Sequence, residues 1–166
     1  TDLTSGIQNT AVGASSLFEL TTGSENTAFG QQALRNTTTA SYNTAVGRAA
    51  LNDNTTGANN TAVGQASLAD NTTASNNTAV GYQSLRLNTT GTRNTAVGAY
   101  ALDAATTVND NTAFGYGALT SNTTGVENTA IGSGAMDQNT TGTDNTAVGW
   151  RALYTNNGNY NTAVGN

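Results

Sequence analysis

Carboxylates are the only side chains in this sequence that could serve an acid–base step or a metal ion. The 166-residue chain contains no His, no Cys and no Lys, so it lacks the usual general bases and activated nucleophiles. Asp110, Glu127 and Asp144 recur at 17-residue intervals, and Arg93 precedes them by the same interval. Stacked coils would place them about 5 Å apart, but the acid spacing of a calcium-binding loop is absent. We interpret this column as a solvated face and expect no catalytic group, metal site or cofactor.

Aromatic side chains form a second group with recognisable chemistry. Those that follow a repeated glycine within two residues are Tyr82, Tyr100, Tyr116 and Trp150. Near the end of the chain, Arg151, Tyr154 and Tyr160 join Trp150. Exposed rings can stack on sugars, so the candidates for glycan contact are Tyr116, Trp150, Arg151 and Tyr154. Exposed aromatics without any ligand are the commoner case, and this remains the alternative interpretation.

Composition and charge exclude several classes of protein. Charged residues make up only 9% of the chain, and the net charge is −5. The five Arg residues are scattered, which argues against nucleic-acid binding, because that function needs a basic surface that neutralises phosphates. No apolar run approaches the length of a membrane span, so we expect no membrane insertion. Without Cys, the redox compartment is left open.

One five-residue phrase, Asn-Thr-Ala-Val-Gly, recurs along the whole chain. Counting the variants with Phe or Ile in place of Val, the ten copies begin at Asn9, Asn26, Asn43, Asn60, Asn77, Asn94, Asn111, Asn128, Asn145 and Asn161. Successive copies lie 17 residues apart, except for the last, which lies 16 residues on. With the Asn as position 1, the unit reads N-T-A-V-G-x-x-A-L-x-x-N-T-T-G-x-x.

A 17-residue unit is too short for a packed helix pair but suits one coil of a β-solenoid. Thr and Val favour short strands, while Gly at position 5 and Gly or small residues at position 15 supply the turns. The sequence therefore predicts an all-β fold, a parallel β-solenoid of ten coils forming a single domain over residues 1–166. At about 4.8 Å per coil, the rod would be roughly 50 Å long.

The repeat also predicts which residues stack on one another. Asn at position 1 and Thr at positions 2, 13 and 14 can form hydrogen-bonded ladders between coils. Leu at position 9, replaced once by Met136, is the core row. The central members of this row are Leu34, Leu51, Leu68, Leu85, Leu102 and Leu119.

Positions 3 and 4 carry an unbroken pair of apolar rows. Successive strand residues point to opposite faces, so only one of these rows can lie inside the coil. The other row leaves an apolar stripe along the rod, and such a stripe normally marks an interface. The interface candidates are Ala45, Ala62, Ala79 and Ala96 in one row and Val46, Val63, Val80 and Val97 in the other. A lone solenoid with a partly apolar face is the alternative.

Position 8 varies where position 3 does not. Ser16, Ser67 and Ser84 replace Ala at position 8, as an exposed or half-exposed row would permit. Position 3 is Ala in every copy, which favours close packing, either inside the coil or against another chain.

The phrases at Asn26–Gly30 and Asn128–Gly132 resemble the N-S-V-A-I-G repeats of trimeric autotransporter adhesin heads. The longer pattern N-T-A-V-G…A-L…N-T-T-G is similar to repeats in phage tail fibres, and the resemblance spans Thr4 to Gly165. It implies a left-handed β-roll with three chains side by side, exposed on a cell or virion surface. Thr stands where the adhesin heads have Val, and the period is longer, so the partner specificity of those heads is not carried over.

The leading functional hypothesis is a structural or adhesive segment of a longer extracellular fibre. As a homotrimer it would present a binding tip, with any receptor or cell-surface glycan bound through flanking parts. A filament subunit that associates end to end is one alternative, because Thr1 enters at position 10 and Asn166 stops at position 6. An ice-binding solenoid with Thr ladders is another, although Phe29 and Phe114 would interrupt a flat face. We do not expect an enzyme.

Overall fold

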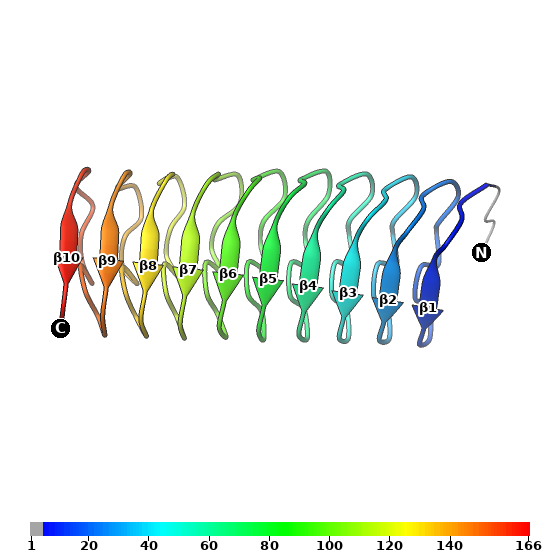
Figure 1. Cartoon of the computed structure of the whole chain (residues 1–166), viewed down its shortest axis with the longest axis horizontal. Helices are drawn as coiled ribbons and strands as arrows, with labels where there is room; N and C mark the ends of the chain where they lie inside the picture. Colours follow the sequence, from blue (N-terminus) through cyan, green and yellow to red (C-terminus); the bar gives the residue numbers. More distant parts are fainter. Residues whose placement is uncertain (1–4) are drawn as a thin grey trace.

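The computed structural model describes residues 5–166 and shows a rod of stacked coils, with one short strand in each coil (Figure 1). The strands are β1 (Thr10–Val12), β2 (Thr27–Phe29), β3 (Thr44–Val46), β4 (Thr61–Val63), β5 (Thr78–Val80), β6 (Thr95–Val97), β7 (Thr112–Phe114), β8 (Thr129–Ile131), β9 (Thr146–Val148) and β10 (Thr162–Val164). They form a single parallel sheet in chain order, and the described part contains no helix. The prediction of a parallel β-solenoid is confirmed.

The sheet register follows the repeat residue for residue. In the pair β4–β5, for example, Ala62 lies beside Ala79 and Val63 beside Val80. The Ala at the centre of β2 to β9 is fully buried, whereas the Thr and the Val, Phe or Ile on either side are at least partly exposed. The open alternative is thereby resolved: position 3 lies inside the coil and position 4 faces outward.

Glycine at position 5 ends each strand because no other residue fits there. Gly64 has φ +136°, and a Cβ on it would come within 2.3 Å of the carbonyl oxygen of Gly81 in the next coil. Gly81 meets the same obstacle at 2.5 Å from Gly98. Both the backbone conformation and the close approach of the coils therefore require glycine.

The Leu row lies inside the rod but on turns rather than strands. Leu85 has φ +50°, in the left-handed region that costs an ordinary residue about 1–2 kcal/mol. Its side chain is fully buried, and this burial offsets the strain. The same φ and burial recur along the row, in Leu34, Leu51, Leu68, Leu85, Leu102 and Leu119. Positions 7 and 17 also adopt positive φ, so with the glycine at position 5 each complete coil contains four residues of positive φ.

A ladder of buried amides joins the coils at position 1. Asn77 Nδ2 donates a hydrogen bond to Gly91 O at 2.8 Å. Asn77 Oδ1 accepts one from the backbone N–H of Asn94 at 2.9 Å and another from Asn94 Nδ2 at 3.3 Å. Equivalent bonds link Asn26 to Asn43 and Asn128 to Asn145. The predicted Asn ladder is confirmed, and it satisfies polar groups that would otherwise be costly to bury.

The Thr ladder at position 13 differs in its acceptor. Thr72 Oγ1 donates to the backbone carbonyl of Thr89 at 3.0 Å, and Thr55 Oγ1 donates to Thr72 O at 2.9 Å. The hydroxyl thus bonds to the main chain of the next coil rather than to the next hydroxyl.

The expectation of an exposed row at position 8 is wrong. Ser67 and Ser84 are fully buried, as is Ala101 in the same row. Ser67 Oγ donates to Ala79 O at 2.9 Å and lies 3.0 Å from Ser84 Oγ, while Ser84 Oγ donates to Gly81 O at 3.2 Å. A hydroxyl that reaches nearby main-chain carbonyls can replace a methyl group inside the rod, so the Ser–Ala exchange did not indicate exposure.

The turn at position 15 alternates between two forms along the first six coils. Gly23, Gly57 and Gly91 alternate with residues that carry a Cβ, which are Ala40, Ala74 and Val108. A Cβ on Gly57 would lie 2.1 Å from Ala74 O. The N–H that follows each of these glycines is bound by a side chain of the next coil. For example, Thr92 N donates to Asn109 Oδ1 at 2.7 Å. Glycine is therefore needed in every second coil here. Ala40 and Ala74 agree with the prediction of glycine or a small residue at this position, whereas Val108 is larger than predicted.

Candidate functional site

The outward row at position 4 is an apolar feature that runs along the rod from β1 to β10. We use this name for Val12, Phe29, Val46, Val63, Val80, Val97, Phe114, Ile131, Val148 and Val164. Phe29 is 56% exposed and Phe114 54% exposed, whereas Val63 and Val80 are partly covered by their neighbours. Of the two rows of interface candidates, only the Val row can contact another chain, because the Ala row (Ala45, Ala62, Ala79 and Ala96) is buried in the coil's own interior.

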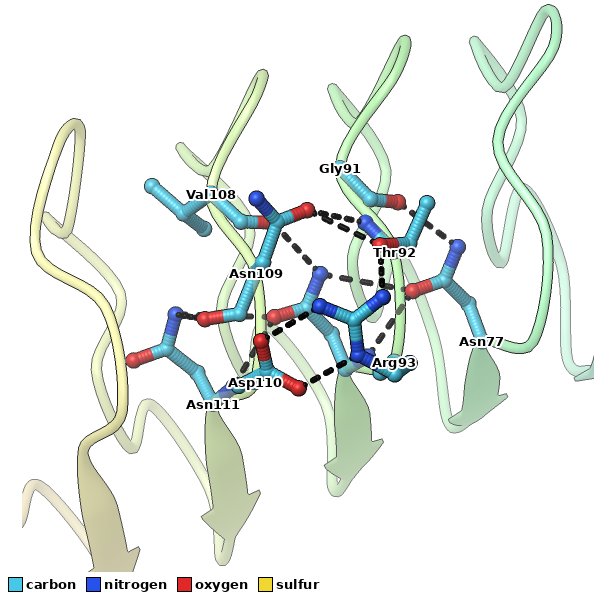
Figure 2. A network of polar contacts seen from close by, with 9 residues as sticks. Asn77, Gly91, Thr92, Arg93, Val108, Asn109, Asp110 and Asn111 are labelled. Carbon is cyan, nitrogen blue, oxygen red and sulfur yellow. Dashed lines mark hydrogen bonds and ion pairs between the residues drawn. The ribbon is translucent and has the colours of Figure 1, made fainter.

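The acidic column at position 17 begins with a two-point ion pair, shown in Figure 2. Arg93 Nε lies 2.6 Å from Asp110 Oδ1, and its Nη2 donates to Asp110 Oδ2 at 2.7 Å. This hydrogen bonding lowers the pKa of Asp110 and raises that of Arg93. Further along the column, a hydrogen bond and charge repulsion from Asp144 raise the pKa of Glu127.

This column is a solvated face. Within residues 5–166 no three His, Cys, Asp or Glu side chains cluster closely enough to hold a metal ion. Arg93, Asp110 and Glu127 are exposed, so their interactions are screened by water. The polar contacts of Asn77 and Asn111 in Figure 2 belong to the amide ladder that holds the coils together.

A groove of about 570 Å³ lies on the side of the rod, across the coils of β6 to β9. We call it the aromatic groove. Tyr100 and Tyr116 line one end, and Trp150 and Tyr154 line the other. Gly117 lies on the floor between them.

The groove results from small residues at places where other coils carry larger ones. The residues of position 7 in four successive coils are Tyr100, Gly117, Gly134 and Arg151, so two side chains are missing between a ring and a guanidinium group. Position 6 repeats the arrangement, with Ser133 between Tyr116 and Trp150. At about 4.8 Å per coil, Tyr116 and Trp150 are separated by roughly 10 Å along the rod.

Stacking between side chains fixes both ends of the groove. The guanidinium carbon of Arg151 lies 5.1 Å from the centre of the Trp150 ring and 4.6 Å from that of Tyr154. These are cation–π distances. At the other end, Tyr100 and Tyr116 meet edge to face with their centres 5.9 Å apart, and Tyr82 packs on Tyr100 in the same way at 5.3 Å.

The four predicted glycan-contact residues, Tyr116, Trp150, Arg151 and Tyr154, all line this groove. Tyr160, which the sequence placed in the same aromatic group, is 81% exposed and is not part of the lining. Sequence reasoning missed Tyr100 as a wall and Asp137 as a lining carboxylate. The signal that could have revealed the groove was the pair of glycines at position 7, because that position holds a side chain in the earlier coils.

Comparison with known proteins found no matching family model, no similar curated protein and no similar solved structure. In the part of the chain that the structure describes, no helix has the length and apolar character needed to cross a bilayer.

Proposed function

We propose that this chain is a rod-shaped segment of a homotrimeric fibre on a cell or virion surface, with the outward row facing the trimer axis. The observation that carries the proposal is the continuity of this row, which has an apolar residue in all ten copies of the repeat. The resemblance to adhesin-head and tail-fibre repeats supports three chains and an extracellular location; the row alone supports only association.

Burial of the outward row makes association more favourable as the rod becomes longer. With about 30 Å² buried per residue of the row and roughly 25 cal/mol per Å², burial contributes on the order of 7 kcal/mol per chain. Association costs about 4–15 kcal/mol in lost freedom, so a rod with only a few coils would remain monomeric. Association that depends on the length of the apolar row explains why position 4 is apolar in all ten copies of the repeat.

A single-cysteine cross-linking experiment tests the orientation of the chains. The protein contains no Cys, so Val80→Cys introduces one thiol in the outward row. A short three-armed maleimide should join three chains of this variant, because equivalent residues meet at the axis. Thr90→Cys is the matched control, since Thr90 is exposed in a different row. Failure of the Val80→Cys variant to form cross-linked trimers would contradict the proposal.

Ice binding is the second candidate function, favoured by the regular row of Thr residues beside the outward row. Thr44, Thr61 and Thr78 stand in register on three successive strands. The exposed rings of Phe29 and Phe114 interrupt the flatness that an ice surface requires. A thermal-hysteresis measurement on the purified chain distinguishes the two functions, because a fibre segment should show none.

The prediction of an end-to-end filament involves Thr1, which lies outside the described residues, and it stays a prediction.

A further inference from the structure

We propose that the aromatic groove is a binding site for a neutral oligosaccharide, held between its two aromatic ends. The groove is lined by residues at positions 6, 7 and 10 of the repeat, whereas the outward row is at position 4. The inference therefore goes beyond the proposed fibre function and does not depend on trimer formation.

The exposed ring faces are the first argument. Trp150 is 56% exposed and Tyr116 is 63% exposed, and both line the groove. The C–H faces of a pyranose ring pack on such rings, because the ring face carries negative charge density and is weakly hydrated. A separation of roughly 10 Å along the rod leaves room for sugar units between the two rings rather than for direct contact of one ring with the other.

The polar groups of the groove match hydroxyl groups. Asp137 is half-buried in the lining, and Gln138 Nε2 donates to its Oδ2 at 3.2 Å, which leaves Oδ1 as an acceptor. Arg151, which lines the groove from the next coil, supplies N–H donors, and Ser133 adds a hydroxyl. A carboxylate and a guanidinium together can bind the vicinal hydroxyls of a sugar. Their charges balance, and the carboxylate disfavours an acidic sugar, so the expected ligand is neutral.

The groove is preformed, which lowers the entropic cost of binding. Its floor residues are held by main-chain hydrogen bonds between coils: Gly117 N donates to Ala99 O at 3.0 Å, and Gly134 N donates to Tyr116 O at 2.9 Å. The Arg151 backbone N–H is bound to Ser133 O at 3.0 Å. Since these residues need not rearrange, a small ligand loses little free energy to reorganisation.

A proline-rich peptide is the main competing ligand, because such peptides also dock in aromatic grooves. The half-buried carboxylate of Asp137 argues against it, since a proline-rich segment offers that group few N–H donors.

Intrinsic fluorescence gives a direct assay, because the only Trp of the chain, Trp150, lines the groove. The intact protein is titrated with maltotriose, cellotriose and chitotriose, and in parallel with 3′-sialyllactose and oligoproline. We expect a saturable change with at least one neutral trisaccharide, and none with the other two probes. The inference is overturned if no neutral trisaccharide saturates up to about 10 mM, or if only the acidic sugar or the peptide does.

Filling the groove provides the decisive variant. The double variant Gly117→Gln, Gly134→Gln puts glutamine at position 7 in both coils. Glutamine already occupies this position at Gln32 and Gln83, whose φ angles are +61° and +52°. The coils should therefore still fold, as circular dichroism would verify. Binding of the responding trisaccharide, measured by calorimetry, should weaken about tenfold or more.

Tyr42→Asn is the matched control, because it removes an exposed ring outside the groove and Asn76 occupies the same position of the repeat. Binding should be unchanged in this variant. Equal affinity in the filled variant, or equal loss in the Tyr42→Asn variant, overturns the inference. A response that depends on protein concentration would indicate that a second copy of the chain fills the groove, and this too overturns it.

Discussion

Asn88 and Ala105 occupy position 12 of the repeat in successive coils. A second ladder of buried amides, distinct from the one at position 1, runs along position 12 and ends at Asn88. Asn71 Nδ2 donates to Asn54 Oδ1 at 2.7 Å, and Asn88 Nδ2 donates to Asn71 Oδ1 at 3.0 Å. Ala105 offers no donor for the next step, so Asn88 Oδ1 is buried without a hydrogen-bond partner among the described residues. Such an atom costs about 1–3 kcal/mol.

Restoring the ladder should stabilise the rod. Ala105→Asn with Val108→Ala recreates the pairing of Asn71 and Ala74 found two coils earlier. The new amide would reach Asn88 Oδ1, so we expect a gain of about 1 kcal/mol after subtracting the cost of removing the methyl groups of Val108. Ala105→Asn alone should destabilise, because Val108 is packed in the core beside Ala105. Urea unfolding of the parent, the Ala105→Asn variant and the double variant measures these changes in stability. A double variant that is less stable than the parent would contradict the prediction.

Two adjacent residues of β5 should respond in opposite ways to a change in polarity. Ala79 is fully buried, so Ala79→Asp places an unpaired charge inside the rod and should unfold at least the neighbouring coils. Val80 faces outward, so Val80→Ser should leave the circular-dichroism spectrum of the coil intact. If the Asp variant kept the parent's spectrum and melting temperature, the assignment of inside and outside would be wrong.

The amide ladder at position 1 should be a major source of stability. Asn77→Ala leaves Gly91 O and the backbone N–H of Asn94 without their partners. We expect a loss of about 2–4 kcal/mol. Thr90→Ala, at an exposed site, is the control and should change stability by less than about 0.5 kcal/mol. Denaturant titration followed by circular dichroism compares them, and equal losses would refute a special role for the ladder.

The acidic column should make stability depend on pH. The hydrogen bond to Asp144 and its charge raise the pKa of Glu127 above its ordinary value of 4.5. The folded chain therefore binds this proton more readily than the unfolded chain, so its stability should rise as pH falls from 7 to about 5. Asp110 acts in the opposite direction, because Arg93 lowers its pKa below 3.8 and stability is lost only at lower pH.

Asp144→Asn tests this directly, since Asn59 and Asn76 hold the same position of the repeat in other coils. The variant should melt at a higher temperature than the parent at pH 7 and show a smaller rise on acidification. Burial raises the pKa values of Asp70 and Asp103. These two residues contribute equally to the pH dependence of stability in the parent and in the Asp144→Asn variant. Identical pH profiles of melting temperature would contradict the coupling between Glu127 and Asp144.

The regular period made the fold predictable from the sequence. An identical residue every 17 positions must stack on itself, and this gave the parallel coils, the interior Leu row and the Asn ladder. The local conformation was less accessible. Leu85 lies at φ +50°, a conformation that backbone propensity alone would not predict for Leu. It adopts this conformation because the burial of its side chain outweighs the backbone strain.

Other features depend on contacts between rows that the sequence does not display. The buried hydroxyl of Ser67 could not be distinguished from an exposed one until its acceptor, Ala79 O, was located. The aromatic groove was only half predicted, because its rings are visible in the sequence while its depth comes from the side chains absent at Gly117 and Gly134.

The mass of the particle in solution tests the central claim most directly. Sedimentation equilibrium at micromolar concentration should give three times the 16.7 kDa of one chain. The triple variant Val63→Ser, Val80→Ser and Val97→Ser should fall to the mass of a single chain with an unchanged circular-dichroism spectrum. A parent protein that sediments as a well-folded monomer, or a triple variant that keeps the trimeric mass, would contradict assembly through the outward row.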